Sequence, residues 1–261
     1  MDLELKGKAA VVLASSKGLG KAVARQFSLE GTQVMISGRD EETLEKTAKE
    51  ISTESDTPVY WHVCDITKTE DIHSLMEEAK DKMGRIDVVV NNAGGPKPGS
   101  FEDMDDSDWE QAFELTLFSF IRSIRAALPE LKKNQGKIVN IASSSLKEPV
   151  DDLILSNTFR MGIAGLSKSL ARELAPDGVL INTIGPGKIA TDRTKGLDEA
   201  KADRSGKTFE EVRANSEDSI PMERYGTPEE FAKQVVFYGS GANTYVTGQI
   251  LLVEGGAVKA Y

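Results

Sequence analysis

Short apolar runs alternate with longer amphipathic segments along almost the whole chain. The first run, Ala9–Ala14, precedes a segment with apolar residues at helical spacing, and this order then repeats. Some runs, such as the three valines at 88–90, are continuously apolar, which is typical of parallel strands covered by helices on both sides. The pattern predicts strands at Ala9–Ala14, Gln33–Ser37, Val59–Cys64, Asp87–Val90, Lys137–Ile141, Val179–Ile184 and Gln249–Val253, and helices at Gly20–Leu29, Glu41–Ile51, Thr69–Met83, Ser107–Leu131, Asn157–Leu174 and Pro228–Tyr238.

This order of elements predicts one α/β domain over residues 1–261, a doubly wound parallel sheet of about seven strands with helices on both faces. No Pro- or Ser-rich linker and no internal repeat divides the chain. The connection 188–220 is long and charged, and short helices are expected in it at Ala200–Asp203 and Phe209–Ser216. Connections of this length are usually functional, so we interpret it as a mobile substrate lid, with a solvated excursion as the alternative.

The composition excludes some kinds of partner. Among 261 residues, 32 are Lys or Arg and 42 are Asp or Glu, so the formal charge of −10 argues against a nucleic-acid partner. The longest apolar run falls far short of the roughly 20 residues that span a bilayer, which predicts no membrane partner and a cytoplasmic location. Cys64 is the only cysteine, and with only His62 and His73 beside it no metal site is expected.

The segment after the first predicted strand is rich in small residues. It consists of Ser15, Ser16, Lys17, Gly18, Leu19 and Gly20 and leads into the first helix. Glycines at such a turn let the backbone approach a pyrophosphate, and the helix N-terminus offers free N–H groups and a favourable dipole. The turn therefore predicts a dinucleotide site, with a plain strand-to-helix connection as the alternative.

Further motifs follow at intervals along the chain. They are Cys64-Asp65-Ile66-Thr67, Asn91-Asn92-Ala93-Gly94, Pro186-Gly187, and Thr247-Gly248-Gln249 with Val253-Glu254-Gly255-Gly256. Together with the turn, these motifs resemble the short-chain dehydrogenase/reductase family over nearly the whole chain, in the style of its divergent 3-oxoacyl-acyl-carrier-protein reductase-like branch. The resemblance implies a Rossmann-like fold, with cofactor contacts from the turn and from Asp65, Ile66, Asn92, Ala93, Gly94, Pro186, Gly187, Ile189 and Thr191. It also implies a homodimer or homotetramer built on the helices around 115–128 and 159–174.

Two features of this sequence bear on the cofactor. The family's first Thr and first Gly of the turn are Leu13 and Ala14 here, and because Ala prefers negative φ we expect weaker, though not abolished, binding. The second strand ends without the acid that accepts a ribose 2′-hydroxyl, and Arg39 follows it. Arg39 and Lys17 therefore predict NADP in preference to NAD, unless both are merely exposed surface cations.

The catalytic residues of the family are not all present. The family uses an Asn, a Ser, a Tyr and a Lys four residues after the Tyr, but no tyrosine of this chain has a Lys at that spacing. By the resemblance, Ser156 and Arg160 stand at the Tyr and Lys positions, Ser143 at the Ser position and Thr116 at the Asn position. A serine hydroxyl is a far poorer acid than a phenol, and Arg160 stays protonated, so Arg160 can bind an anion or a ribose but cannot transfer a proton.

Lys147 is a candidate replacement for the missing acid. It follows Ser143 by four residues, and partial desolvation near Arg160 would lower its pKa; the alternative is a solvated loop residue. We therefore expect an NADP-dependent oxidoreductase that moves a hydride between nicotinamide and a carbonyl or alcohol substrate, with Ser143 orienting the substrate oxygen. The alternative expectations are a non-catalytic dinucleotide-binding protein with a regulatory or sensor role, and a scaffold that binds no dinucleotide.

Overall fold

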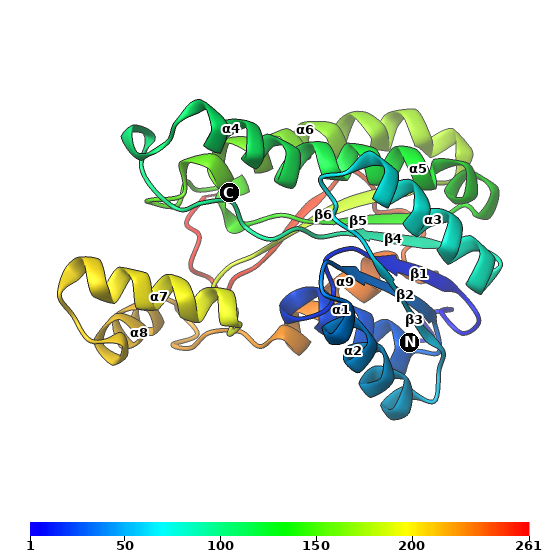
Figure 1. The fold of residues 1–261 in the computed structure, drawn as a ribbon, viewed down its shortest axis with the longest axis horizontal. Coiled ribbons are helices and arrows are strands. Elements are labelled where there is room, and N and C mark those ends of the chain that lie inside the picture. The colour runs from blue at the N-terminus through cyan, green and yellow to red at the C-terminus, as the bar shows by residue number, and fades with distance from the viewer. Residues whose placement is uncertain (261) are drawn as a thin grey trace.

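The computed structural model describes residues 1–260, so that Tyr261 lies outside the described residues. Within this range the chain forms a seven-stranded parallel sheet with the order β3-β2-β1-β4-β5-β6-β7 (Figure 1). This confirms the predicted α/β fold. The strands are β1 (Ala9–Val12), β2 (Gln33–Gly38), β3 (Val59–Val63), β4 (Val88–Asn91), β5 (Lys137–Ile141), β6 (Leu180–Pro186) and β7 (Ile250–Val253).

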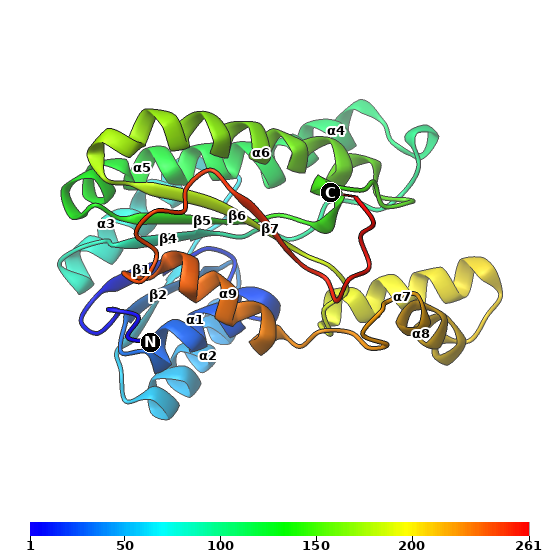
Figure 2. The same cartoon turned by 180° about the vertical axis from the view of Figure 1, so that it is seen from behind.

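Helices cover both faces of the sheet. The helices are α1 (Gly18–Leu29), α2 (Glu41–Ser55), α3 (Thr69–Met83), α4 (Asp106–Phe113), α5 (Ser119–Asn134), α6 (Ile154–Leu174), α7 (Asp192–Ser205), α8 (Phe209–Asp218) and α9 (Pro228–Gly239). α3, α5 and α6 pack on one face and α1, α2 and α9 on the other, whereas α7 and α8 extend beyond the sheet (Figures 1 and 2). None of the helices between residues 1 and 260 is long and apolar enough to cross a membrane.

The structure divides one predicted helix and lengthens two others. The expected helix Ser107–Leu131 is interrupted by a π-helical turn, Glu114–Phe118, where the Thr116 hydroxyl donates to the Ala112 carbonyl at 2.5 Å. Such back-bonding by a hydroxyl competes with the regular backbone ladder. In segment 188–220, the two expected short pieces are the longer helices α7 and α8. The expected motion of a lid, the homo-oligomer and the cytoplasmic location stay predictions.

A buried polar network ties the centre of the sheet to two of its helices. Asn91 on β4 donates to the side-chain oxygen of Asn140 on β5 at 2.7 Å, and accepts from Ser123 on α5. Asn140 in turn donates to Ser167 on α6 at 2.9 Å, and Ser167 lies 2.9 Å from the hydroxyl of Thr183 on β6. All five side chains are buried, so each polar group depends on its neighbours for a hydrogen bond.

We predict that Asn140→Ala lowers the free energy of unfolding by about 3 kcal/mol, because it leaves the buried Asn91 amide without its acceptor and removes one of the two partners of the Ser167 hydroxyl. Urea unfolding followed by circular dichroism measures this change. Asn215→Ala, at an exposed position of α8, is the control and should change stability by less than about 0.5 kcal/mol. Equal stability of the two variants would contradict a structural role for the network.

Candidate functional site

A cleft of ≈ 1590 Å³ runs along the carboxyl ends of the parallel strands. Its wall includes the turn after β1, the segments that follow β2 to β6, the first half of α6, and α7. Ligands of open α/β sheets bind at this edge, because the strand ends and the helix N-termini meet there. In the described part of the chain, no three His, Cys, Asp or Glu side chains are grouped so as to hold a metal ion.

The turn after β1 has the form expected of a phosphate-binding loop. Helix α1 begins at Gly18, with no side-chain cap from Lys17 and no acidic residue in its first turn, so its first N–H groups face the cleft without an anion from the chain. Gly20 is closely enclosed, because a Cβ there would lie 2.6 Å from the Ala14 carbonyl oxygen and 2.9 Å from Nδ2 of Asn92. This exposed helix start and glycine-dependent packing fit a dinucleotide pyrophosphate.

The six predicted residues of this turn fall into two groups, those that line the cleft and those that lie beneath the turn. Ser16, Lys17, Gly18 and Leu19 line the cleft, as do Asn92, Ala93 and Gly94 from the segment after β4. Ser15 is fully buried and lies beneath the surface of the turn, where its hydroxyl donates to the Val12 carbonyl at 2.6 Å and accepts from the Ser37 N–H at 3.0 Å. Ser15 and Gly20 therefore support the turn from below and do not face the ligand space.

Ala14 adopts a left-handed backbone conformation, which glycine reaches most readily. Its φ is +49°, in the left-handed region, where the methyl group costs about 1 kcal/mol. The Asn92 amide donates to the Ala14 carbonyl at 3.0 Å, and the Ala14 N–H donates to the Ser37 hydroxyl at 3.3 Å. The preference of Ala for negative φ is thus overridden by these contacts, and the turn keeps its shape at a cost in stability.

We predict that Ala14→Gly raises the free energy of unfolding by about 1 kcal/mol, because glycine reaches positive φ without the steric cost of a methyl group. Ala214→Gly, at an exposed position in the regular helix α8, provides a control of opposite sign and should lower stability by about 0.5–1 kcal/mol. Chemical denaturation of the two variants beside the parent chain measures both effects. A loss of stability in both would show that Ala14 carries no strain.

The end of the cleft next to β2 and β3 brings together Arg39, Lys17 and Asp65. Lys17 and Arg39 are exposed, and no carboxylate of residues 1–260 lies within 4.0 Å of either charge. Although burial opposes it, hydrogen bonds from Thr67 and the charges of Arg39 and Lys68 hold the pKa of Asp65 below its ordinary value. Asp65 and Ile66 both line this end of the cleft, and Asp65 is ionised at neutral pH, whereas their contact with adenine stays a prediction.

The opposite end of the cleft contains Ser143 and the residues after β6. Ser143 caps a 3₁₀ turn, and its oxygen accepts from the Ser145 N–H at 3.1 Å, which leaves its own proton free to be donated. Pro186, Gly187, Ile189 and Thr191 line the same end, as expected. A Cβ on Gly187 would lie 2.5 Å from the Cβ of Glu254, so glycine allows this segment to pack against the chain after β7.

Ser156 and Arg160 lie one helical turn apart on α6 and face the cleft together. Nε of Arg160 donates to the Ser156 hydroxyl at 3.2 Å, and Nη1 donates to the Ile141 carbonyl at 3.1 Å. Arg160 is only 6% exposed, and burial together with the nearby charge of Arg193 lowers its pKa to about 10. The guanidinium therefore stays protonated at neutral pH, as the sequence predicts, and provides a buried positive charge.

Two candidate residues, Thr116 and Lys147, do not line the cleft. Thr116 is fully buried, and its hydroxyl is used inside the π-helical turn. Lys147 is exposed and is not among the residues that line the cleft, so the partial desolvation that would prepare it as a proton donor is not found. The reason is the 3₁₀ turn Ser144–Leu146, after which the chain turns toward the surface.

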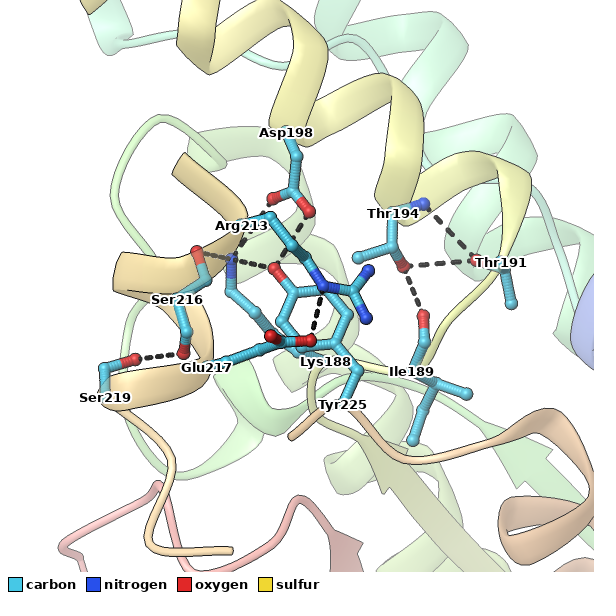
Figure 3. A network of polar contacts seen from close by, with 10 residues as sticks. All are labelled: Lys188, Ile189, Thr191, Thr194, Asp198, Arg213, Ser216, Glu217, Ser219 and Tyr225. Carbon is cyan, nitrogen blue, oxygen red and sulfur yellow. Dashed lines mark hydrogen bonds and ion pairs between the residues drawn. The ribbon is translucent and has the colours of Figure 1, made fainter. Parts of the chain in front are cut away.

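Segment 188–220 is held to the end of β6 by a compact polar network (Figure 3). The Tyr225 hydroxyl donates to Asp198 at 2.9 Å, and the Lys188 ammonium donates to Ser216 at 3.1 Å and to Tyr225 at 3.3 Å. The Arg213 guanidinium lies 3.5 Å from the centre of the Tyr225 ring. Burial raises the pKa of Tyr225 to about 12, so its phenol stays protonated and acts as a donor to Asp198.

The two ends of α7 also contact segments on the other side of the cleft. Near its start, Nη2 of Arg193 donates to the Pro96 carbonyl at 3.2 Å, and near its end Arg204 forms an ion pair with Asp152 at 3.1 Å. The sequence analysis did not assign Arg193 to the site. Its position two residues after Thr191, which the analysis did assign, is the signal that points to it.

Comparisons with known proteins agree with this fold and site. The family described as Enoyl-(Acyl carrier protein) reductase matches residues 13–258. The chain is 33% identical to the uncharacterized oxidoreductase YvrD of Bacillus subtilis (strain 168), over 100% of both chains. It is 32% identical to the 3-oxoacyl-[acyl-carrier-protein] reductase FabG of Aquifex aeolicus (strain VF5), over 98% of this chain and 99% of that protein.

Solved structures show the same likeness. The L-sorbose reductase from Gluconobacter frateurii, complexed with NADPH and L-sorbose, superimposes with a TM-score of 0.95 at 27% identity over 100% of both chains. A 7α-hydroxysteroid dehydrogenase complexed with NADH gives a TM-score of 0.90 at 30% identity, over 99% of this chain and 97% of that one. The fold is that of these oxidoreductases, whose structures contain NADPH and NADH, respectively. The chain belongs to the short-chain dehydrogenase/reductase family, as its motifs predicted.

Proposed function

We propose that the protein is an NADP-dependent oxidoreductase that interconverts a carbonyl and an alcohol with a non-standard set of catalytic residues. The observation that carries this proposal is the convergence of Ser143, Ser156 and Arg160 in one cleft with the glycine turn. When bound, the nicotinamide cofactor supplies or accepts the hydride. The L-sorbose reductase, whose structure contains NADPH, supports the type of cofactor and reaction.

The chain's own residues polarise the substrate oxygen. The Ser143 hydroxyl has a proton to donate, and the Ser156 hydroxyl accepts from Arg160 and likewise keeps its own proton. Negative charge that develops on the substrate oxygen is stabilised by these donors and by the nearby guanidinium, which are fixed in place before the reaction. Since Arg160 does not release a proton at neutral pH, solvent water supplies the proton to the alkoxide.

We predict that Ser143→Ala lowers kcat about 100-fold, because it removes a preorganised donor to the substrate oxygen. NADPH affinity should stay the same in this variant, which separates a catalytic effect from a loss of cofactor. Stopped-flow measurement of NADPH oxidation with a panel of ketones provides kcat, and Ser74→Ala, at an exposed position of α3, is the matched control. Unchanged turnover in Ser143→Ala would remove this residue from the proposed mechanism.

The preference for NADP over NAD rests on Lys17 and Arg39. Both cations face the cleft where the second strand ends, and neither is paired with a carboxylate in the described structure. The nearby charge of Asp65 offsets part of this positive field, and its carboxylate accepts hydrogen bonds from the Thr67 N–H and hydroxyl. A 2′-phosphate would gain charge-assisted hydrogen bonds from both cations, whereas a 2′-hydroxyl would not.

We predict that Arg39→Ala lowers the ratio of NADPH to NADH affinity by roughly 10- to 100-fold, as expected for one lost hydrogen bond between charged groups. Calorimetric titration of cofactor-free protein with each dinucleotide measures the ratio. Arg125→Ala, an exposed change of equal charge on α5, controls for the general field. A ratio that is the same in all three proteins would rule out Arg39 as the specificity residue.

A non-catalytic dinucleotide-binding protein is the second candidate function. The observation that favours it is the internal use of the Thr116 hydroxyl together with the exposed position of Lys147, since neither residue lines the cleft. Such a protein would bind NADPH with an affinity like that of the enzyme, yet would not oxidise it with any carbonyl substrate. The kinetic panel described above separates the two functions directly.

A further inference from the structure

The charges that line the cleft are balanced overall but are not all paired. Eight basic and eight acidic side chains contribute to the wall. Three of these basic groups form ion pairs with carboxylates of the described residues: Arg122 with Glu114, Lys188 with Asp198 and Arg204 with Asp152. The basic groups without such a pair are Lys17 and Arg39 near the turn, Arg160 and Arg193 at the other end, and Lys201 on α7.

Arg160 is a buried cation that the chain satisfies only in part. Its Nε and Nη1 donate to neutral oxygens of Ser156 and Ile141, and no carboxylate of residues 1–260 lies within 4.0 Å of the guanidinium. Nη2 makes no hydrogen bond to any described residue. Burying an ion without a counter-ion costs free energy. An anion that enters the cleft is therefore attracted by the unpaired charge of Arg160.

Arg193 reaches the same region from α7. Its guanidinium lies directly over Gly95, where a Cβ would come within 2.1 Å of Nη2, so this conformation of Arg193 requires a glycine at position 95. Arg193 lines the same cleft as Arg160, its charge is one of the two causes that lower the pKa of Arg160, and its one hydrogen bond within the described chain goes to the neutral carbonyl of Pro96. Two like charges thus line one cleft, and neither has a carboxylate of residues 1–260 within 4.0 Å.

We propose that Arg160 and Arg193 form an anion-binding subsite, and that the substrate is an oxo acid whose carboxylate lies between the two guanidinium groups while its carbonyl lies at Ser143. Planar guanidinium groups match a carboxylate through paired hydrogen bonds. A carboxylate suits the site better than a phosphate dianion, because the acidic half of the wall, including Asp192 beside Arg193, limits the local positive field. This inference rests on the proposed function only for the reaction at the carbonyl.

The first test is binding without turnover. Ligand-observed NMR titration of cofactor-free protein compares pyruvate, acetoacetate and levulinate with the methyl esters of the same acids. We expect at least one acid to bind about 100-fold more tightly than its ester, because the ester keeps the carbonyl and loses the charge. Equal affinity of acids and esters throughout the series overturns the proposal.

Variants assign the effect to the two arginines. Arg193→Met and Arg160→Met should each weaken binding of the preferred acid at least 10-fold and leave binding of its ester unchanged. Gly95→Ala should weaken the acid in the same way by displacing the flexible end of Arg193 while the total charge is kept. Arg25→Met, far from the cleft on α1, is the control of equal charge and should bind the acid like the parent chain.

Arg193 and Gly95 keep the test decisive if Arg160→Met fails to fold, since Arg193 is exposed and donates to a single carbonyl. If Arg193→Met and Gly95→Ala both bind the acid like the parent chain, the proposal is wrong. If Arg160→Met loses NADPH affinity but keeps affinity for the acid, Arg160 serves the cofactor and the subsite is again excluded.

The same proteins separate this inference from the proposed function. If the acid binds through both arginines but no acid of the series is reduced by NADPH, the subsite stands and the oxidoreductase function fails. If neutral ketones and oxo acids are reduced with equal kcat/KM, the oxidoreductase function stands and the subsite fails. Support for both requires kcat/KM for an acid about 100-fold above that for its ester, with this preference lost in Arg193→Met.

Discussion

The hydrogen bonds of Asn140 are the constraint on which the geometry of the site depends. Through Asn91 and Ser167, this one side chain connects β4 and β5 to α6, at a depth where no water replaces a lost partner. Ser143 follows Asn140 by three residues in the chain. Arg160 on α6 donates a hydrogen bond to the carbonyl of Ile141, the residue next to Asn140. The buried Asn140 amide therefore links β5, which leads to Ser143, to α6, which carries Ser156 and Arg160.

A buried positive charge gives the site its chemical character. In a cleft whose acidic and basic side chains are equal in number, Arg160 is shielded from water and is bonded only to neutral oxygens. Its charge cannot be used to deliver a proton, and so it is available to attract an anion or to stabilise an alkoxide. Ser156 and Arg160 thus provide hydrogen-bonding groups and a positive charge at this wall of the cleft.

The shape of the cleft also depends on backbone segments that approach one another closely. Gly20, Gly95 and Gly187 each lie where a Cβ would collide with a neighbour; Gly95 and Gly187 line the cleft, and Gly20 lies beneath the turn after β1. Ala14 instead has a left-handed backbone conformation despite its methyl group. Its carbonyl accepts from the Asn92 amide and its N–H donates to the Ser37 hydroxyl, and these bonds keep the conformation. The dinucleotide turn is therefore maintained by its tertiary contacts, even where its local residue preference opposes the conformation.

The sequence by itself determined the order of the elements, the parallel sheet and the edge at which the site forms, because hydrophobic periodicity and turn residues act over short distances along the chain. It also brought Ser156 and Arg160 together, since residues four apart share a face of a helix. Only the tertiary structure decided that Ser15 lies under the turn, that Lys147 is exposed and does not line the cleft, and that Arg193 lines the same cleft as Arg160. Those facts depend on burial and on contacts between residues far apart in sequence, such as Arg193 and Gly95, which no local pattern encodes.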